Sequence, residues 1–231
     1  MPASADAFIA RWQGREGGQE RANYALFLTE LCDVIGVDRP QPASASTAEN
    51  DYVFERLVTR YQPDGTPGSG RIDLYKRDCF VLEAKQSRQL PGGRDNAPPL
   101  LPGLPPASTR GVRSASRSWD VLMLNARRQA EDYARSLPSD HGWPPFLLVC
   151  DVGHVIEIYA DFSGQGRNYA QFPDRQSFRI YMEDLRAPET RRLLAQIWTN
   201  PHQLDPARQT ARVTRDIAER LAAVSKALED A

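Results

Sequence analysis

Three side chains, Asp73, Glu83 and Lys85, are of the types and at the spacing needed to hydrolyse a phosphodiester bond. Two carboxylates can hold Mg²⁺, a hard cation that prefers oxygen ligands. A metal held in this way polarises a phosphodiester oxygen and lowers the pKa of a bound water, while a lysine orients that water or offsets developing negative charge. These residues therefore predict a metal-dependent hydrolytic site, with Asp73 and Glu83 as the metal ligands.

The sequence around these residues predicts two strands joined by a short turn. Side chains alternate between the two faces of a strand, so Glu83 and Lys85 share one face of a strand at 79–85. By the same alternation, Asp73 lies opposite its two apolar neighbours. The polar residues 76–78 suit a hairpin turn, which would bring Asp73 and Glu83 together across the sheet. The alternative is an exposed hairpin whose solvated face carries an ordinary Glu–Lys pair.

The composition is that of an ordinary folded protein, with 41% hydrophobic and 26% charged residues. A chain of 231 residues can form one α/β domain with an appendage. The formal net charge of −1 carries no global signal for nucleic acid, so any DNA contact must come from a local basic patch. There is no evident signal peptide, lipidation motif or membrane-spanning apolar run, which predicts a cytoplasmic protein.

The three cysteines, Cys32, Cys79 and Cys150, lie far apart in apolar segments and form no CxxC pair. Buried free thiols are the expected state of such residues in a reducing compartment. The histidines also lack the spacing of zinc ligands, so we do not expect zinc.

Hydrophobic periodicity outlines the elements that would position the site. We expect a short helix at 6–14, a longer amphipathic helix that ends at Gly36, and then the strands that carry the acidic residues. A second clear helix is expected at 119–137, followed by two strands around a turn at 151–154. Another strand and a short helix complete a predicted domain over residues 1–200.

Three segments outside these elements are expected to differ in character. Residues 63–70 are rich in turn formers and predict a flexible turn. Residues 88–118 are rich in proline and arginine and predict an irregular loop, which is either a plain insertion or a basic stretch that orders on a nucleic-acid backbone. Residues 201–231 predict a helical connector whose apolar stripe either folds back on the domain or leads to a larger assembly.

The helix at 119–137 carries Gln129 and Tyr133 one turn apart on one face. By itself this pair is better explained by a core tyrosine with an incidental glutamine. In the order helix, acidic strands, Gln–Tyr helix and further strands, however, the chain resembles the PD-(D/E)xK nucleases. The resemblance implies an α/β, restriction-endonuclease-like core, a mixed central sheet flanked by helices, with a C-terminal helical extension. It also nominates Glu20 as an acid near the metal.

Longer segments resemble the amino-terminal region of the MmeI-like, type IIL restriction–modification DNA methyltransferases. They are the segments 20–32, 51–55, 72–76, 79–87, 126–135 and 204–221. In that family a PD-(D/E)xK endonuclease precedes a helical connector, an N6-adenine methyltransferase and a target-recognition region. The resemblance covers essentially all of this chain and only the first part of the family's chain.

The resemblance alone would attach a methyltransferase label that the residues do not support. That activity needs an Asn/Asp-Pro-Pro-aromatic motif and a Gly-rich cofactor loop. Here Asn200-Pro201 is followed by His202, and the Pro98-Pro99 pair is followed by Leu100. We therefore expect no S-adenosylmethionine site and no methylation by this chain.

The leading hypothesis is a Mg²⁺-dependent DNA endonuclease domain, with Mn²⁺ as a possible substitute, acting on double-stranded DNA in a bacterial restriction–modification or phage-defence system. In it Lys85 and Glu20 assist the metal site. The expected DNA contacts are Gln86, Gln129, Tyr133, Arg127 and Arg128. The alternative is a non-catalytic DNA-binding or assembly module, in which residues 205–231 dock a chain that carries the methyltransferase and target-recognition parts.

Overall fold

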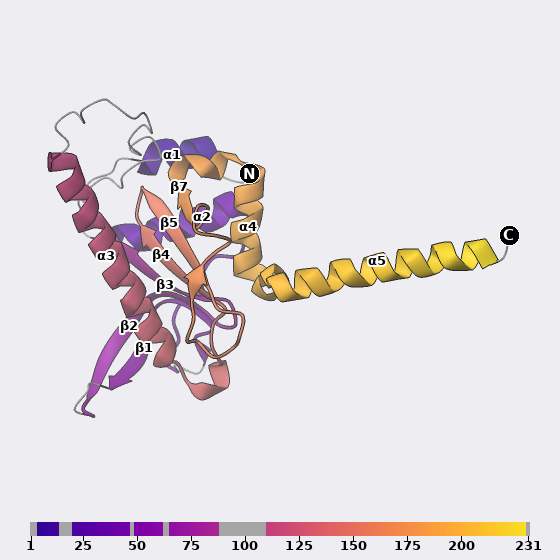
Figure 1. Cartoon of the computed structure of the whole chain (residues 1–231). Coiled ribbons are helices and arrows are strands. Elements are labelled where there is room, and N and C mark those ends of the chain that lie inside the picture. The colour runs from indigo at the N-terminus through magenta and orange to yellow at the C-terminus, as the bar shows by residue number, and fades with distance from the viewer. Residues whose placement is uncertain (1–3, 14–19, 47–48, 62–64, 88–109, 230–231) are drawn as a thin grey trace.

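The computed structural model of the chain describes residues 4–13, 20–46, 49–61, 65–87 and 110–229. Helices cover both faces of a central sheet, and one long helix projects away from it (Figure 1). The expected mixed α/β architecture with helices flanking a sheet is therefore confirmed at this level.

The elements follow the hydrophobic pattern of the sequence, and their bounds are as follows. The helices are α1 (Ala5–Trp12), α2 (Glu20–Ile35), α3 (Arg110–Arg135), α4 (Pro188–Thr199) and α5 (Pro206–Glu229), with 3-10 turns η3 (Ser139–His141), η4 (Met182–Arg186) and η5 (Pro201–Leu204). The strands are β1 (Tyr52–Tyr61), β2 (Pro67–Lys76), β3 (Phe80–Lys85), β4 (Phe146–Asp151), β5 (Val155–Ala160), β6 (Ala170–Gln171) and β7 (Arg179–Tyr181).

The sheet is mostly antiparallel, with one parallel pair at its centre. Its strands follow the order β1-β2-β3-β4-β5-β6, and β7 also pairs with β5. Only β3 and β4 run parallel among the paired strands of the described residues, and they are joined through α3 as a crossover connection. The strand that carries Glu83 and Lys85 is thus held between two neighbours in the middle of the sheet.

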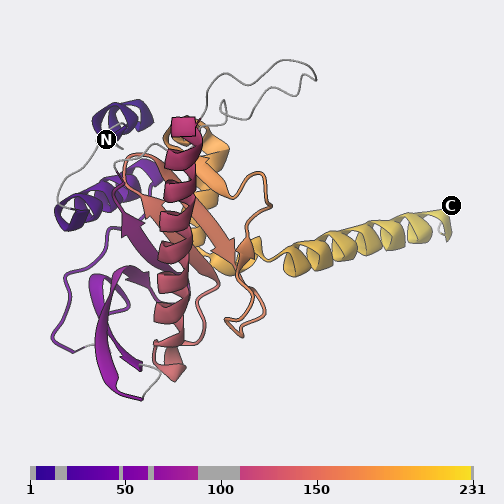
Figure 2. The same cartoon turned by 60° about the vertical axis from the view of Figure 1, so that its left-hand side comes forward.

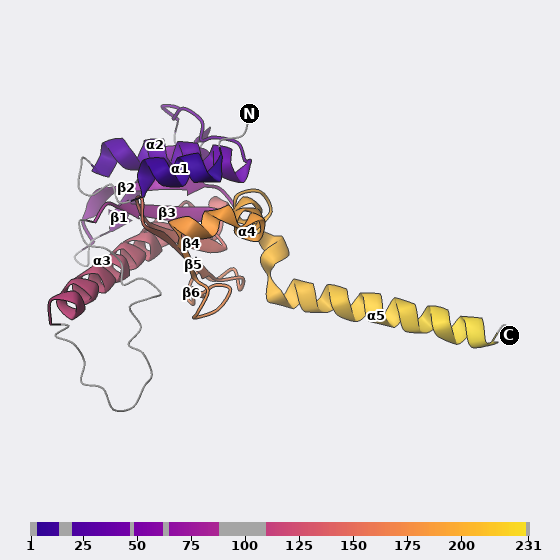
Figure 3. The ribbon, with the colours of Figure 1, turned by 90° about the horizontal axis from the view of Figure 1, so that it is seen from above.

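The sheet separates two hydrophobic cores. One core packs α1, α2 and α4 against one face, and the other packs α3 against the opposite face. Figure 2 shows α3 crossing its face of the sheet, and Figure 3 shows α1 and α2 on the other side of the strands. Along β3 the side chains alternate between the cores as expected, with Leu82 and Ala84 in the first and Val81 in the second.

Two expected boundaries were wrong. β2 begins at Pro67, so 67–70 is strand rather than flexible turn, because its backbone pairs with β1 as far as the Tyr61–Pro67 pair. Residues 110–118 are helical rather than irregular, because the prolines of that segment end at Pro106 and the residues after it are compatible with a helix. The rest of the expected irregular loop, 88–109, lies outside the described residues.

The last helix, α5, does not fold back on the sheet. It leads away from the domain (Figures 1 and 3), and the apolar side chains of Val213, Ile217 and Leu221 are 52%, 53% and 63% exposed. The fold-back alternative for this stripe is therefore wrong. None of the helices in the described part of the chain is both long and apolar enough to cross a membrane.

The thiols of Cys32, Cys79 and Cys150 are free and buried, as expected. Burial raises the pKa of all three thiols, that of Cys79 to about 11. A thiol with that pKa is only about one part in a thousand thiolate at pH 8. We predict that Ellman's reagent at pH 8 labels the folded chain very slowly and labels all three thiols once urea unfolds it. Rapid labelling of the folded chain would contradict this burial.

Candidate active site

Asp73 lies where β2 parts from β3. The last paired residues of the two strands are Leu74 and Leu82, and one step further the ladder stops. There the Asp73 carboxylate Oδ2 accepts the backbone N–H of Ala84 at 2.7 Å. Buried backbone donors need a partner, so the Asp73 side chain takes over the role that a backbone carbonyl plays in a regular ladder. This contact fixes Asp73 beside the strand that carries Glu83.

The simple alternation expected around Asp73 is wrong. Ile72 packs in the core beneath α3 and Leu74 in the core beneath α2, although residues two apart in a regular strand share a face. The partner strand β1 also switches the faces of its side chains at this point. There Glu55 lies opposite Asp73 in the register, but the two residues do not form a ladder pair. Glu55 has a φ of 54°, which is unusual for a residue other than glycine. The reversal therefore occurs in both strands, at the two acidic residues.

Glu83 and Lys85 form an ion pair in the wall of the site. The Lys85 ammonium donates to Glu83 Oε1 at 2.6 Å. The Glu83 side chain is only 1% exposed and that of Lys85 is 22% exposed. A buried carboxylate is costly unless a cation or hydrogen bonds compensate it. The expected sharing of one face by these residues is thus confirmed, and the lysine is anchored by the carboxylate.

Gln129 and Tyr133 on α3 form the opposite wall. The Gln129 amide donates to the Tyr133 hydroxyl at 3.0 Å, so the two side chains act together as expected from their spacing. The ring of Tyr133 lies against Gly70 of β2, where an added Cβ would come 2.7 Å from its Cε1 atom. Gly70 is therefore needed for the close approach of α3 to this strand.

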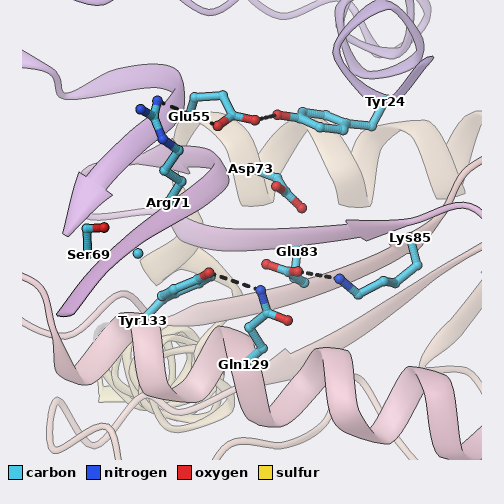
Figure 4. A pocket seen from close by; sticks show the side chains of 10 residues that line it. Tyr24, Glu55, Ser69, Arg71, Asp73, Glu83, Lys85, Gln129 and Tyr133 are labelled. Carbon is cyan, nitrogen blue, oxygen red and sulfur yellow. Dashed lines mark hydrogen bonds and ion pairs between the residues drawn. The ribbon is translucent and has the colours of Figure 1, made fainter. Parts of the chain in front are cut away.

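These groups meet in one pocket of about 410 Å³, shown in Figure 4. Residues from α2, β1, β2, β3 and α3 line it. Five of the residues singled out from the sequence are among them: Asp73, Glu83, Lys85, Gln129 and Tyr133. The structure thus brings together side chains that lie up to 60 positions apart in the chain.

The other five lining residues were not foreseen as part of a site: Tyr24, Glu55, Ser69, Gly70 and Arg71. The Tyr24 hydroxyl donates to Glu55 Oε1, and Arg71 Nη1 lies 3.8 Å from Glu55 Oε2. The sequence pattern identified Tyr24 only as part of an apolar helix face. Glu55 gave no signal, since its place depends on the reversal of strand faces.

Two other expected site residues, Glu20 and Gln86, are not among the pocket-lining residues that the structure describes. Glu20 is the first residue of α2, and its side chain lies outside the part of the chain that the structure describes. Gln86 follows β3 and does not line the pocket. Its side-chain oxygen accepts a hydrogen bond from the Asn23 amide at 2.9 Å, which ties the end of β3 to α2.

The two arginines expected to contact DNA also lie outside the pocket lining. Arg127 donates to Glu131 at 3.0 Å and to the carbonyl of Tyr169 at 2.8 Å, and its guanidinium lies 4.4 Å from the centre of the Tyr159 ring. These contacts hold α3 to the sheet. Arg128 is exposed and can reach a ligand outside the pocket.

The buried carboxylate of Asp151 fixes the segment that follows β3, next to the pocket. Asp151 at the end of β4 is fully buried. Its carboxylate accepts the backbone N–H of Ser87 at 2.8 Å, and the Ser87 hydroxyl and the Trp119 indole N–H at 2.7 Å each. One side chain thus joins β4, the segment after Lys85, and α3. The sequence indicated only a turn at Asp151.

The donor chemistry of the pocket fits a hard divalent cation. Carboxylates from Glu55, Asp73 and Glu83 outnumber the cationic groups of Arg71 and Lys85 among the lining residues. Among the described residues, no group of three or more His, Cys, Asp or Glu side chains is arranged so that it could hold a metal ion. Mg²⁺ does not need such a group, because it binds through one or two carboxylates and completes its shell with water and substrate oxygens.

The close approach at Gly70 gives a prediction for this wall of the pocket. We expect Gly70→Ala to lower the free energy of unfolding by about 1–3 kcal/mol, because its methyl group must displace the Tyr133 ring and shift the flexible Arg60 side chain, whose nearest atoms would lie 2.7 and 2.9 Å from it. Urea denaturation measures the loss. In a Tyr133→Ala background the same substitution should cost much less, and an equal cost in both backgrounds would refute the close contact.

The comparison with known families agrees with the resemblance noted in the sequence. The family model described as "MmeI, N-terminal domain" matches residues 3–231. The match includes the pocket residues and α5. No curated protein and no solved structure matches the chain. The chain belongs to the MmeI N-terminal domain family.

Proposed function

We propose that this domain is a Mg²⁺-dependent DNA endonuclease with a restriction-endonuclease-like PD-(D/E)xK core. Membership of the MmeI N-terminal family supports a role in restriction–modification. The observation that carries the finer proposal is the meeting of Asp73, Glu83 and Lys85 with Gln129 and Tyr133 in one polar pocket. Two carboxylates, a lysine and neutral hydrogen-bond donors are the groups that phosphodiester hydrolysis needs.

In this proposal Asp73 and Glu83 hold Mg²⁺, and Glu20 at the start of α2 assists as a further acid. The cation, when bound, supplies Lewis-acid polarisation of the phosphodiester and activation of the attacking water. Lys85 is anchored on Glu83, so its ammonium can orient water or offset the charge that develops on the phosphate. Mn²⁺ has similar ligand preferences and is expected to substitute.

The opposite wall positions the DNA backbone. The Tyr133 hydroxyl oxygen accepts the hydrogen bond from Gln129, so the hydroxyl hydrogen can point towards a phosphate oxygen. Such contacts orient the backbone without reading sequence. Gln86, Arg127 and Arg128 remain proposed DNA contacts, and the exposed Arg128 is the best placed of the three, because it is open to a ligand outside the pocket.

Two conservative variants test the nuclease. Asp73→Asn keeps a side-chain oxygen that can accept the Ala84 N–H but removes the negative charge. Lys85→Arg keeps a cation beside the buried Glu83 but replaces the compact ammonium. We expect both variants to stay folded and to nick supercoiled plasmid in Mg²⁺ or Mn²⁺ at least about 10²-fold more slowly than the wild type.

The control for this assay is Asp33→Asn, which removes a carboxylate that pairs with Arg39 and does not line the pocket. It should cleave at the wild-type rate. Cleavage that survives Asp73→Asn and Lys85→Arg would show that the nuclease activity lies elsewhere. Wild-type chain that binds plasmid and never cleaves it, with either metal, would also contradict the proposal.

The exposed stripe of α5 favours a second candidate, a non-catalytic DNA-binding or assembly module. In it Val213, Ile217 and Leu221 dock a chain that carries methyltransferase and target-recognition parts, and the pocket is a scaffold. DNA binding without cleavage, even after such a partner is added, would favour this role over the nuclease.

The stripe can be tested on the chain itself. Because Ile217 and Leu221 are more than half exposed, we predict that replacing both with serine changes the free energy of unfolding by no more than about 0.5 kcal/mol. Thermal or urea unfolding measures this. A marked loss of stability would mean that the stripe packs on the domain in solution, which would remove the basis for the docking role.

A further inference from the structure

Glu55 is the most unusual backbone position in the pocket. It lies in the middle of the ten-residue strand β1, yet its φ is 54°. A left-handed conformation is unfavourable for a residue other than glycine or asparagine, and such residues concentrate at functional sites. The conformation delivers the Glu55 carboxylate to the pocket, where the Tyr24 hydroxyl donates to it.

The group that Glu55 holds is the guanidinium of Arg71. The two charged groups are 3.8 Å apart, which is an ion pair but longer than a hydrogen bond. The Arg71 side chain remains 53% exposed at the pocket rim (Figure 4). Its N–H groups can therefore donate to an external acceptor while the carboxylate keeps the guanidinium in place.

Ser69 extends this donor surface. It lies two residues before Arg71 on β2, so both side chains occupy one face of the strand, and both line the pocket. A hydroxyl and a guanidinium on one strand face are typical contacts to the oxygens of a nucleic-acid backbone. A planar guanidinium also matches a phosphate with two parallel hydrogen bonds.

We propose that Ser69 and Arg71 form a binding subsite for a backbone phosphate of the DNA strand that enters the pocket. The subsite rests on the proposed nuclease function for its substrate, but Ser69 and Arg71 are not among the proposed metal ligands. Glu55 is a positioning residue that holds Arg71 at the rim, and Tyr24 orients Glu55. This arrangement uses the left-handed backbone at Glu55, where the carboxylate lines the pocket and pairs with Arg71.

The salt dependence of DNA affinity measures phosphate contacts directly. Each contact contributes about 0.9 to the slope of log affinity against log salt concentration. Fluorescence anisotropy with two duplexes of unrelated sequence, in Ca²⁺, gives this slope for the wild-type chain and for Arg71→Gln. We expect Arg71→Gln to reduce the slope by about 1 and to weaken both duplexes by the same factor.

Matched variants separate the subsite from general charge effects. Arg39→Gln removes an exposed arginine that pairs with Asp33 and does not line the pocket, and it should leave the slope unchanged. Arg71→Lys should retain the slope, since the charge stays, but weaken binding through loss of the fork-shaped donor. Because Glu55 acts through Arg71, the double variant Glu55→Gln/Arg71→Gln should lose less affinity than the product of the losses in the two single variants.

The outcomes distinguish this proposal from the nuclease itself. An unchanged slope in Arg71→Gln, or an equal reduction in Arg39→Gln, overturns the subsite even if Asp73→Asn abolishes cleavage. A reduced slope in Arg71→Gln supports the subsite even if the chain never cleaves DNA. Wild-type chain that binds neither duplex overturns the subsite outright.

Discussion

The pocket depends on one hydrogen bond, from the backbone N–H of Ala84 to the carboxylate of Asp73. It forms where β2 leaves β3, and it satisfies a donor that the shortened ladder would otherwise leave unpaired. The same contact keeps Asp73 beside the Glu83–Lys85 ion pair on the neighbouring strand. The Asp73 side chain thus satisfies a backbone donor and also has a proposed catalytic role.

Around this point the structure combines rigid support with unusual local geometry. The central strand β3 lies between two neighbours, and the buried carboxylate of Asp151 secures the segment after it to α3. By contrast, the edge strand β1 and its neighbour β2 reverse their faces at Glu55 and Asp73. Charged side chains can reach a pocket in this way because the well-packed structure around the irregular residues holds their backbone in place.

The predictable part of the site came from short-range patterns. The period of two places Glu83 and Lys85 on one face of a strand, and the period of 3.6 places Gln129 and Tyr133 one turn apart. Glu55 and Arg71 follow no such pattern, since their meeting requires the pairing of β1 with β2 and a left-handed residue within a strand. Arg127 shows what spacing leaves open: this basic residue beside the Gln–Tyr pair contacts the sheet and lies outside the pocket lining, and its DNA contact stays a prediction.

The sequence by itself determined the α/β class, the order of the elements, the family, and five of the residues that line the pocket. These depend on side-chain type and local spacing, which a single chain displays directly. Only the tertiary structure decided the reversal of faces at Asp73, the Tyr24–Glu55–Arg71 chain of contacts, and the exposure of α5. Each of these depends on which distant segment packs against which, and local periodicity carries no information about that choice.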